Sequence, residues 1–176
     1  MSLSLDGQIY NLIDLLTPPI GETANVQQRL RQIVHAAVQI FGADYASVYP
    51  FHPEIRGALD PVAEPDHFRL RRTTQYTQQI LAQGSLVISS SVTADQFQEP
   101  FPGEADIRTS VALRLRTRPS SIDLGVIFLD YREERHFTPE EQYSLQSFAD
   151  QASLALQQTW LLHRYDEVNR LGQAIN

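Results

Sequence analysis

Cysteine is absent from this sequence. The absence excludes disulfide bonds, thiolate nucleophiles and cysteine-ligated metal sites. It also excludes a chromophore attached to the protein through a thioether.

Lysine is absent as well, because all 14 basic residues are arginine. Schiff-base chemistry needs a lysine amine, and the phosphate-binding P-loop needs a lysine at a fixed position. Both are excluded. Compositional bias of the source genome is a sufficient reason for the missing lysine, so we use the absence only to exclude mechanisms.

Long apolar runs are missing too. No stretch approaches the roughly 20 residues that span a bilayer, and no charged-then-apolar signal sequence opens the chain. The net charge of −7 gives no electrostatic footprint for nucleic acid. We therefore expect a cytoplasmic protein without membrane or nucleic-acid partners, and the 176 residues suit a single domain, 1–176, with a substantial core.

Two amphipathic helices are predicted in the first part of the chain. The first, within 1–20, carries a stripe of Ile9, Leu12, Ile13 and Leu16, and the prolines that follow end it. The second begins at a capping-box-like Asn25 and ends at Gly42, where a left-handed cap residue is expected. The second helix opens the domain body, 24–163.

Strands and loops alternate through the middle of the chain. Tyr45–Tyr49 alternates like a strand, and the proline-rich stretch 52–66 predicts a loop with an irregular edge strand. A helix over 73–83 and a short strand over 86–88 follow. The polar stretch 89–106 suits a loop with at most one short helix, over 93–97.

The stretch from Ile107 to His163 is the most informative, because it predicts strand, turn, strand and one long helix. Arg108–Arg116 alternates, whereas Leu124–Tyr131 is apolar on both faces. Thr138 offers an N-cap hydroxyl, with proline next and Glu141 completing a capping box. The fold class is therefore α+β, built on a mostly antiparallel sheet.

These residues resemble a GAF domain. The resemblance rests on the strand pair, the helix start Arg135-His-Phe-Thr-Pro-Glu-Glu141 and the helix-to-strand junction Phe41-Gly-Ala-Asp-Tyr-Ala-Ser-Val-Tyr49, with Leu86-Val-Ile-Ser89 as a further match. It implies a sheet whose one face packs on the N- and C-terminal helices and whose other face, covered by the middle helix and loops, forms a ligand pocket. It also implies a regulatory or sensory module of a larger, bacterial signal-transduction protein, with a separate output domain.

The strand alternation then assigns side chains to the two faces. Ala46, Val48, Val111, Leu113 and Leu115 are expected in the helix-side core. The candidate ligand-binding residues are Ser47, Tyr49, His67, Ser110, Arg114 and Phe128. Four of them have an ordinary alternative: strand packing for Ser47 and Tyr49, a core position for Phe128, and an exposed loop position for His67. The functional roles considered for His67 are contact with a ligand and axial ligation of haem.

Arg114 carries the most weight among these candidates. A guanidinium within a core strand must find a partner, and it suits a ligand carboxylate or phosphate. The alternatives are a salt bridge to Asp95, Asp130 or a loop glutamate, and a position at a solvent-facing edge. Asp130 ends a buried strand, where it is expected to cap a turn or to anchor an arginine. The five histidines show no metal-ligand spacing, so no metal is expected.

The C-terminal helix changes character after about Leu156. Leu161, Tyr165 and Val168 continue at coiled-coil spacing into a linker segment, 164–176, beyond the sheet, where no domain core remains to receive them. Together with Ile9, Leu12 and Leu16 they predict a homodimer interface. The intramolecular alternative is that the two terminal helices pack on each other.

Three hypotheses follow for function. The first is a non-catalytic regulatory domain that binds an unidentified small molecule, with no cofactor and no covalent bilin, and dimerises through its terminal helices. The second is a dimeric scaffold or linker whose pocket is filled by its own side chains. The third, an enzyme, lacks any serine–histidine–aspartate, paired-carboxylate or metal motif to support it.

Overall fold

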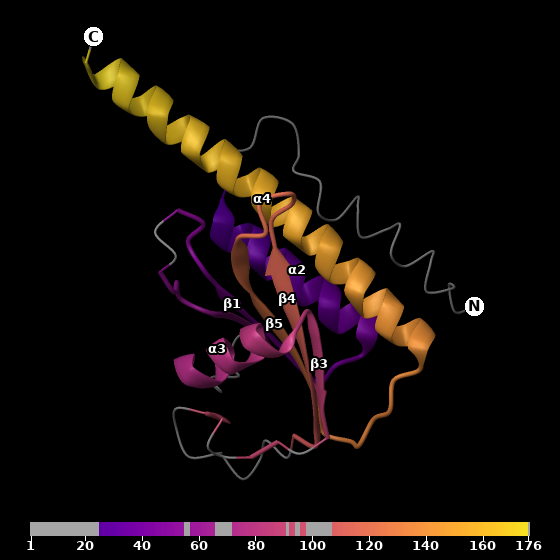
Figure 1. The fold of residues 1–176 in the computed structure, drawn as a ribbon. Helices are drawn as coiled ribbons and strands as arrows, with labels where there is room; N and C mark the ends of the chain where they lie inside the picture. Colours follow the sequence, from indigo (N-terminus) through magenta and orange to yellow (C-terminus); the bar gives the residue numbers. More distant parts are fainter. Residues whose placement is uncertain are drawn as a thin grey trace.

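The computed structural model describes residues 25–54, 57–65, 72–90, 92–93, 96–97 and 107–175 (Figure 1). Ile9, Leu12, Leu16 and His67 lie outside these residues. The elements are, in chain order, α2 (Val26–Phe41), β1 (Tyr45–Pro50), β2 (Val62–Glu64), α3 (Thr74–Gln83), β3 (Leu86–Ser89), β4 (Thr109–Arg116), β5 (Asp123–Tyr131) and α4 (Pro139–Ile175).

The strands form one antiparallel sheet in the order β2-β1-β5-β4-β3. The predicted α+β class and antiparallel sheet are confirmed, and β2 is the irregular edge strand expected within the proline-rich loop. β5 is central, which explains why its sequence is apolar on both faces. Gly125 of β5 has φ 152°, a conformation that favours glycine. A Cβ at this position would lie 2.5 Å from the carbonyl oxygen of Tyr49, so any other residue here would push β1 and β5 apart.

One face of the sheet packs against α2 and α4 (Figure 1). The five side chains predicted for this core are all buried there, together with Ile33 and Leu30 of α2 and Leu145 and Phe148 of α4. The edge-to-face contact of Phe41 and Phe148, with ring centroids 5.4 Å apart, joins the two helices. This layer is the main apolar core.

The opposite face is covered by α3, the predicted middle helix. Ile80 of α3 is buried with Ala112, Val126 and Phe128 of the sheet, and Tyr49 and Tyr76 pack against them. The strand alternation therefore separates the two faces as predicted.

The helix ends follow from local side chains. Asn25 Oδ1 accepts from the Gln28 amide at 3.1 Å, and Gly42 ends α2 at φ 61°. Thr138 and Glu141 form the predicted capping box, since each side chain accepts from the other residue's amide at 3.2 and 2.8 Å.

The helix α4 is the longest element, with 37 residues. Its last buried residue is Thr159, and its C-terminal part extends past the sheet (Figure 1). Within the described ranges, no helix combines the length and the apolarity that crossing a membrane requires.

Candidate functional site

The α3-covered face of the sheet has a buried ion pair at its centre. Arg72, in the segment that leads into α3, is 2% exposed, and Asp130 of β5 is 1% exposed. The guanidinium donates to both carboxylate oxygens, through Nη1 at 3.0 Å and Nη2 at 2.5 Å. Burying both charges is costly unless the geometry is good, and this bidentate arrangement is the geometry that offsets the cost best.

Two hydroxyl groups complete the polar part of this cluster. Ser110 Oγ accepts from Arg72 Nη2 at 2.9 Å and donates to Asp130 Oδ1 at 2.7 Å, so it bridges the pair. The hydroxyl of Tyr49 accepts from the backbone amide of Arg72 at 2.6 Å. Ser110 and Tyr49 are two of the predicted site residues, and both contact Arg72.

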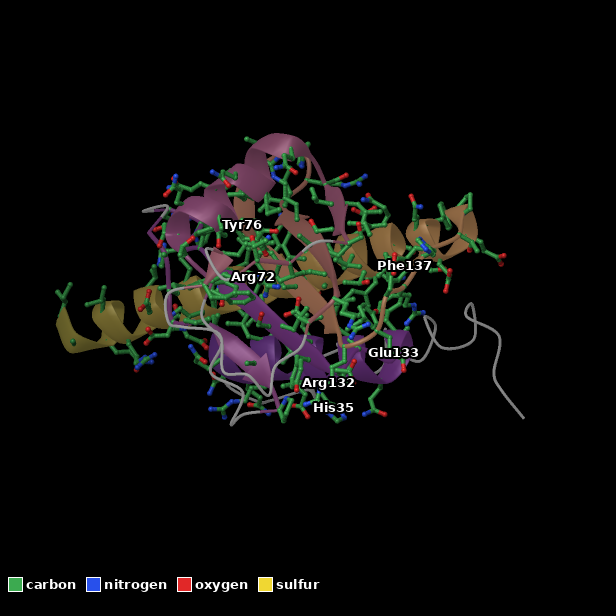
Figure 2. All side chains as sticks on the ribbon, turned by 90° about the horizontal axis from the view of Figure 1, so that it is seen from below. His35, Arg72, Tyr76, Arg132, Glu133 and Phe137 are labelled. Atoms are coloured by element: carbon green, nitrogen blue, oxygen red, sulfur yellow. The ribbon has the colours of Figure 1, made fainter. Side chains whose placement is uncertain are left out.

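Aromatic rings line the guanidinium. Its Cζ lies 3.9 Å from the ring centroid of Phe128 and 5.1 Å from that of Phe97. Phe128 in turn contacts Tyr49 edge-on and Tyr76 in a stacked arrangement, with centroids 5.6 and 6.0 Å apart. Figure 2 labels Arg72 and Tyr76 on this side of the sheet. We call Arg72, Asp130, Ser110, Phe128 and Phe97 the guanidinium cluster.

The predicted residue Arg114 lies on the same face but belongs to a different contact set. Its Nε and Nη2 donate to Asp123 at 2.5 and 2.8 Å, and its Nη1 donates to the Leu81 carbonyl at 3.0 Å. The hydrogen bond to Asp123 raises the pKa of Arg114 above its ordinary value. Among the described residues its partner is Asp123 rather than Asp130, Asp95 lies outside those residues, and the strand arginine ties β4 to β5 and α3.

Comparison with known proteins supports the fold. A model of the GAF domain family matches residues 25–158. The chain belongs to the GAF domain family. The match spans more than half of the chain and covers every described strand.

Solved GAF domains share the fold at low identity. The GAF domain of an Acinetobacter phosphoenolpyruvate-protein phosphotransferase superposes with a TM-score of 0.66 at 11% identity, covering 90% of this chain and 95% of that one. Free methionine-R-sulfoxide reductase from Neisseria meningitidis gives 0.63 at 13%, covering 94% and 95%. The phycocyanobilin-bound GAF domain of a cyanobacterial phytochrome gives 0.59 at 15%, covering 93% and 99%. No curated protein matches the sequence.

In this GAF domain the remaining candidate, Ser47, is 5% exposed on the α3-covered face, opposite Phe128 in the β1–β5 register. Its hydroxyl has no hydrogen-bond partner among the described residues. The structure thus brings Tyr49, Ser110 and Phe128 together around Arg72, holds Ser47 and Arg114 on the same face outside that contact set, and does not place His67.

Arg72 is the residue that sequence reasoning missed. It stands beside Arg71 in a polar stretch, where a solvated arginine is the ordinary expectation. The one available signal was Asp130, a carboxylate in an otherwise apolar strand that was expected to anchor an arginine. Phe97 lies at the end of the stretch where at most one short helix was expected; Gln96 beside it is in a 3-10 turn, with its amide donating to the Thr93 carbonyl, and Phe97 itself forms a β-bridge with Arg72.

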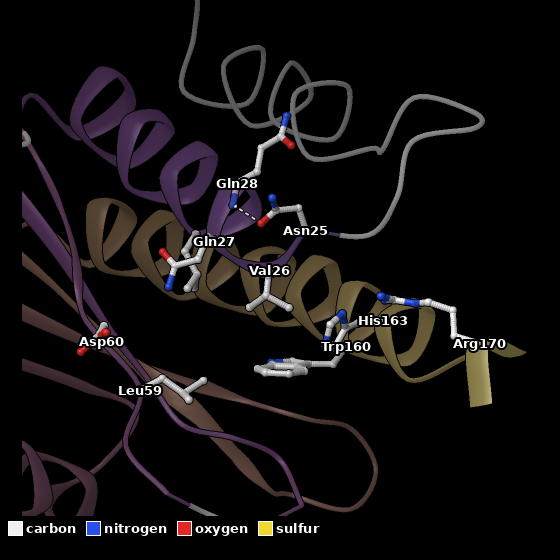
Figure 3. A pocket seen from close by; sticks show the side chains of 10 residues that line it. Asn25, Val26, Gln27, Gln28, Leu59, Asp60, Trp160, His163 and Arg170 are labelled. Atoms are coloured by element: carbon white, nitrogen blue, oxygen red, sulfur yellow. Dashed lines mark hydrogen bonds between the residues drawn. The ribbon is translucent and has the colours of Figure 1, made fainter. Parts of the chain in front are cut away.

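A separate groove of about 750 Å³ lies between the start of α2 and α4 (Figure 3). Trp160 and His163 of α4 line it with Val26, Leu59, Asp60 and other residues, none of them predicted for the site. Within the described ranges, no three histidine, aspartate or glutamate side chains gather as metal ligands would. We take the α3-covered face as the candidate site of this GAF domain, because the predicted residues Tyr49, Ser110 and Phe128 meet there around Arg72.

Proposed function

We propose that this GAF domain is a non-catalytic regulatory module of a larger bacterial signal-transduction protein, located in the cytoplasm. In this proposal it dimerises through its terminal helices and binds a small molecule on the α3-covered face of the sheet. An output domain elsewhere in the parent protein receives the signal. The membership of the GAF family and the exposed part of α4 support this function.

The observation that carries the proposal is the apolar stripe of α4 beyond the core. Large apolar side chains stand more than half exposed on this part of the helix, with exposed fractions of 58% for Leu161, 65% for Tyr165, 60% for Val168, 66% for Leu171 and 85% for Ile175. A run of such side chains on one helix is unusual on a monomeric protein surface, because each buries favourable area only against a partner.

The spacing of the stripe favours a second copy of the same helix. Leu154, Leu161, Val168 and Ile175 recur at every seventh residue, and Tyr165 lies between them at coiled-coil spacing. A seven-residue repeat drives two helices into a left-handed pair. Two copies related by a two-fold axis would cover the stripe with identical contacts.

The same helix would connect a ligand to an output. α4 packs on β4, and β4 carries Ser110 on its opposite face. A ligand that repositions the α3-covered face therefore acts on a strand that α4 contacts. It changes the helix arrangement only to the extent that it binds the two arrangements with different affinity.

The second candidate function is a dimeric scaffold without a ligand. The guanidinium cluster favours it, because Arg72 and its partners fill the centre of the face where a ligand is proposed. In this alternative the domain contributes only its helices, and the buried ion pair fixes the position of α3.

Native mass spectrometry of the purified chain, with a denatured control, tests both parts of the proposal. A dimer with added small-molecule mass is the expected result, whereas a dimer without it favours the scaffold. A monomer at micromolar concentration contradicts dimerisation. In the variant Val168→Glu the dimer should dissociate, because the carboxylate would be buried between two copies.

The matched control is Gln173→Glu, which places the same charge on α4 at an exposed position away from the stripe. It should leave the oligomeric state unchanged. Equal dissociation of both variants would mean that net charge, rather than the stripe, controls the association.

A further inference from the structure

The guanidinium cluster holds the head of Arg72 with groups that belong to other elements. Asp130 and Phe128 come from β5, Ser110 comes from β4, and Phe97 comes from the segment that precedes β4 in the chain. The carboxylate and the hydroxyl accept from the guanidinium N–H groups, and its Cζ lies over the rings of Phe128 and Phe97. Arg72 itself enters from the segment before α3.

Because they come from other elements, the carboxylate, the hydroxyl and the Phe128 ring do not depend on Arg72 for their position in the structure. β4 and β5 pair continuously from Thr109↔Tyr131 to Leu115↔Gly125, with a register shift only before Arg116↔Asp123. Asp130, Ser110 and Phe128 are therefore fixed by the central ladder. A planar cation that is not attached to the protein would meet the same carboxylate, hydroxyl and ring.

We propose that the α3-covered face is a binding site for a small molecule with a guanidinium or amidinium group, and that Arg72 occupies this site as an internal ligand. The inference rests on the small-molecule part of the proposed function and names the chemical class of that molecule. The bidentate carboxylate requires two parallel N–H donors, and the ring face requires a flat, weakly hydrated cation. An ammonium ion meets neither requirement as well.

The α3-covered face has buried polar atoms that are unused. Among the described residues, neither Arg72 Nε nor Ser47 Oγ has a hydrogen-bond partner. Buried polar atoms are normally paired, so each unpaired one needs a reason. Ser47 lies opposite Phe128 in the β1–β5 register, so its hydroxyl is available to a hydrogen-bonding substituent on a ligand that lies over Phe128.

Displacement of Arg72 would also change the structure locally. The backbone of Arg72 donates to Tyr49, its bridge partner is Phe97, and the next residue, Thr73, caps α3 through a 3.1 Å bond from the Tyr76 amide. A ligand that removes the side chain of Arg72 from the cluster therefore acts directly on the start of α3. The internal arginine competes with any free ligand at an effective concentration in the millimolar range.

The test is chemical rescue of Arg72→Ala in the full chain, with methylguanidinium as the probe and methylammonium as the control compound. Methylguanidinium should raise the melting temperature of Arg72→Ala and should bind it in calorimetry, because Asp130, Ser110 and Phe128 remain in place. Methylammonium should have a much smaller effect. Wild type should bind methylguanidinium at least about tenfold more weakly, since Arg72 competes for the site.

Two control variants assign the binding to the cluster. Arg72→Ala with Asp130→Asn should lose the response, because the bidentate carboxylate is gone. Arg118→Ala removes a guanidinium that donates to Asp150 at the exposed surface, away from the cluster, and should show no rescue. The proposal is wrong if the double variant responds like Arg72→Ala, or if wild type binds the probe as tightly as Arg72→Ala does.

If Arg72→Ala does not fold by itself, refolding it from urea in the presence of methylguanidinium or of methylammonium tests the site in the same way. Recovery in methylguanidinium alone supports the site, and no recovery in either compound overturns it. None of these readouts depends on dimerisation or on a co-purified molecule. A rescued variant that is monomeric would thus contradict the dimer proposal and leave the guanidinium site standing.

Discussion

The helix-covered and α3-covered faces of the sheet are both buried, but by different chemistry. Against α2 and α4 the strands bury aliphatic side chains such as Val48, Val111 and Leu113. Against α3 they bury aromatic rings together with the ion pair of Arg72 and Asp130. Hydrophobic burial has no preferred direction, whereas a bidentate ion pair requires particular angles and distances.

The difference separates stability from recognition. Each large apolar side chain on the helix-covered face contributes roughly 1.5–3 kcal/mol by leaving water, and substitutes of similar volume retain most of that. On the α3-covered face a change of one atom can leave a charge buried without a partner. A surface that discriminates between ligands must be sensitive to single-atom changes in the same way. We therefore expect ligand recognition on the α3-covered face and tolerance of substitutions on the helix-covered face.

The largest effect is expected from Asp130→Asn, which hardly changes the volume of the side chain. It removes the negative charge beneath the buried guanidinium and replaces one acceptor oxygen with a donor. Breaking a buried pair in this way costs about 3–5 kcal/mol in the free energy of unfolding. Urea unfolding followed by circular dichroism measures the loss.

The matched control for this variant is Asp150→Asn. Asp150 also accepts two bonds from one arginine, Arg118, at 3.0 Å, but their side chains are 57% and 79% exposed. Exposed pairs contribute about 0–1 kcal/mol. If both variants lose the same small amount, burial does not make the Arg72–Asp130 pair special.

A smaller effect is expected from Ile127→Val on the helix-covered face. Ile127 is fully buried in the apolar core and has no polar partner to lose. Removing one methylene should cost about 0.5–1.5 kcal/mol. The methylguanidinium response of the variant Arg72→Ala should be unchanged when Ile127→Val is added, and a lost response would show that the two faces are not independent.

Sequence predicts the fold well because its signals are local and periodic. Alternation in Arg108–Arg116 assigned Val111, Leu113 and Leu115 to the helix-side core, and the structure places them there. Gly42 and the Thr138 capping box marked helix ends through their own backbone requirements. Such signals need no knowledge of distant residues.

The candidate site was predicted less completely, because its central contacts join residues far apart in sequence. Arg72 and Asp130 are separated by 58 positions, and no periodicity links them. Tyr49 and Ser110 were predicted from their strand positions, but their common partner was not. Arg114 was expected at a ligand or at other carboxylates, whereas Asp123, across the turn from it, satisfies its guanidinium.

Acid should weaken the helix-covered face through the start of α4. The Thr138 backbone N–H is the main reason why the pKa of Glu141 lies below its ordinary value of 4.5. The stabilisation is complete above that value and is lost as pH falls through the lower folded-state pKa. The free energy of unfolding should therefore fall between neutral and acidic pH, and Glu141→Gln, which keeps an acceptor oxygen but has no charge to lose, should make this fall smaller by about 1 kcal/mol or less. Urea titrations at the two pH values measure the difference. An unchanged pH dependence would exclude Glu141 as a contributor.

The smallest net effect is expected when the whole polar contact set is replaced. Arg72→Met, Ser110→Ala and Asp130→Leu together remove both charges and the bridging hydroxyl. Buried ion pairs replaced by apolar groups of similar volume are often neutral in stability, so this triple variant should lie within about 1 kcal/mol of wild type. It should also bind no methylguanidinium.

Comparing the triple variant with Asp130→Asn decides what the ion pair is for. A stable triple variant means that the α3-covered face could be as apolar as the helix-covered face, and that its charges serve recognition rather than folding. If the triple variant is as unstable as Asp130→Asn, the pair orients α3 in a way that apolar contacts do not replace. In that case the contrast between the two faces is one of structure, and the scaffold function gains support.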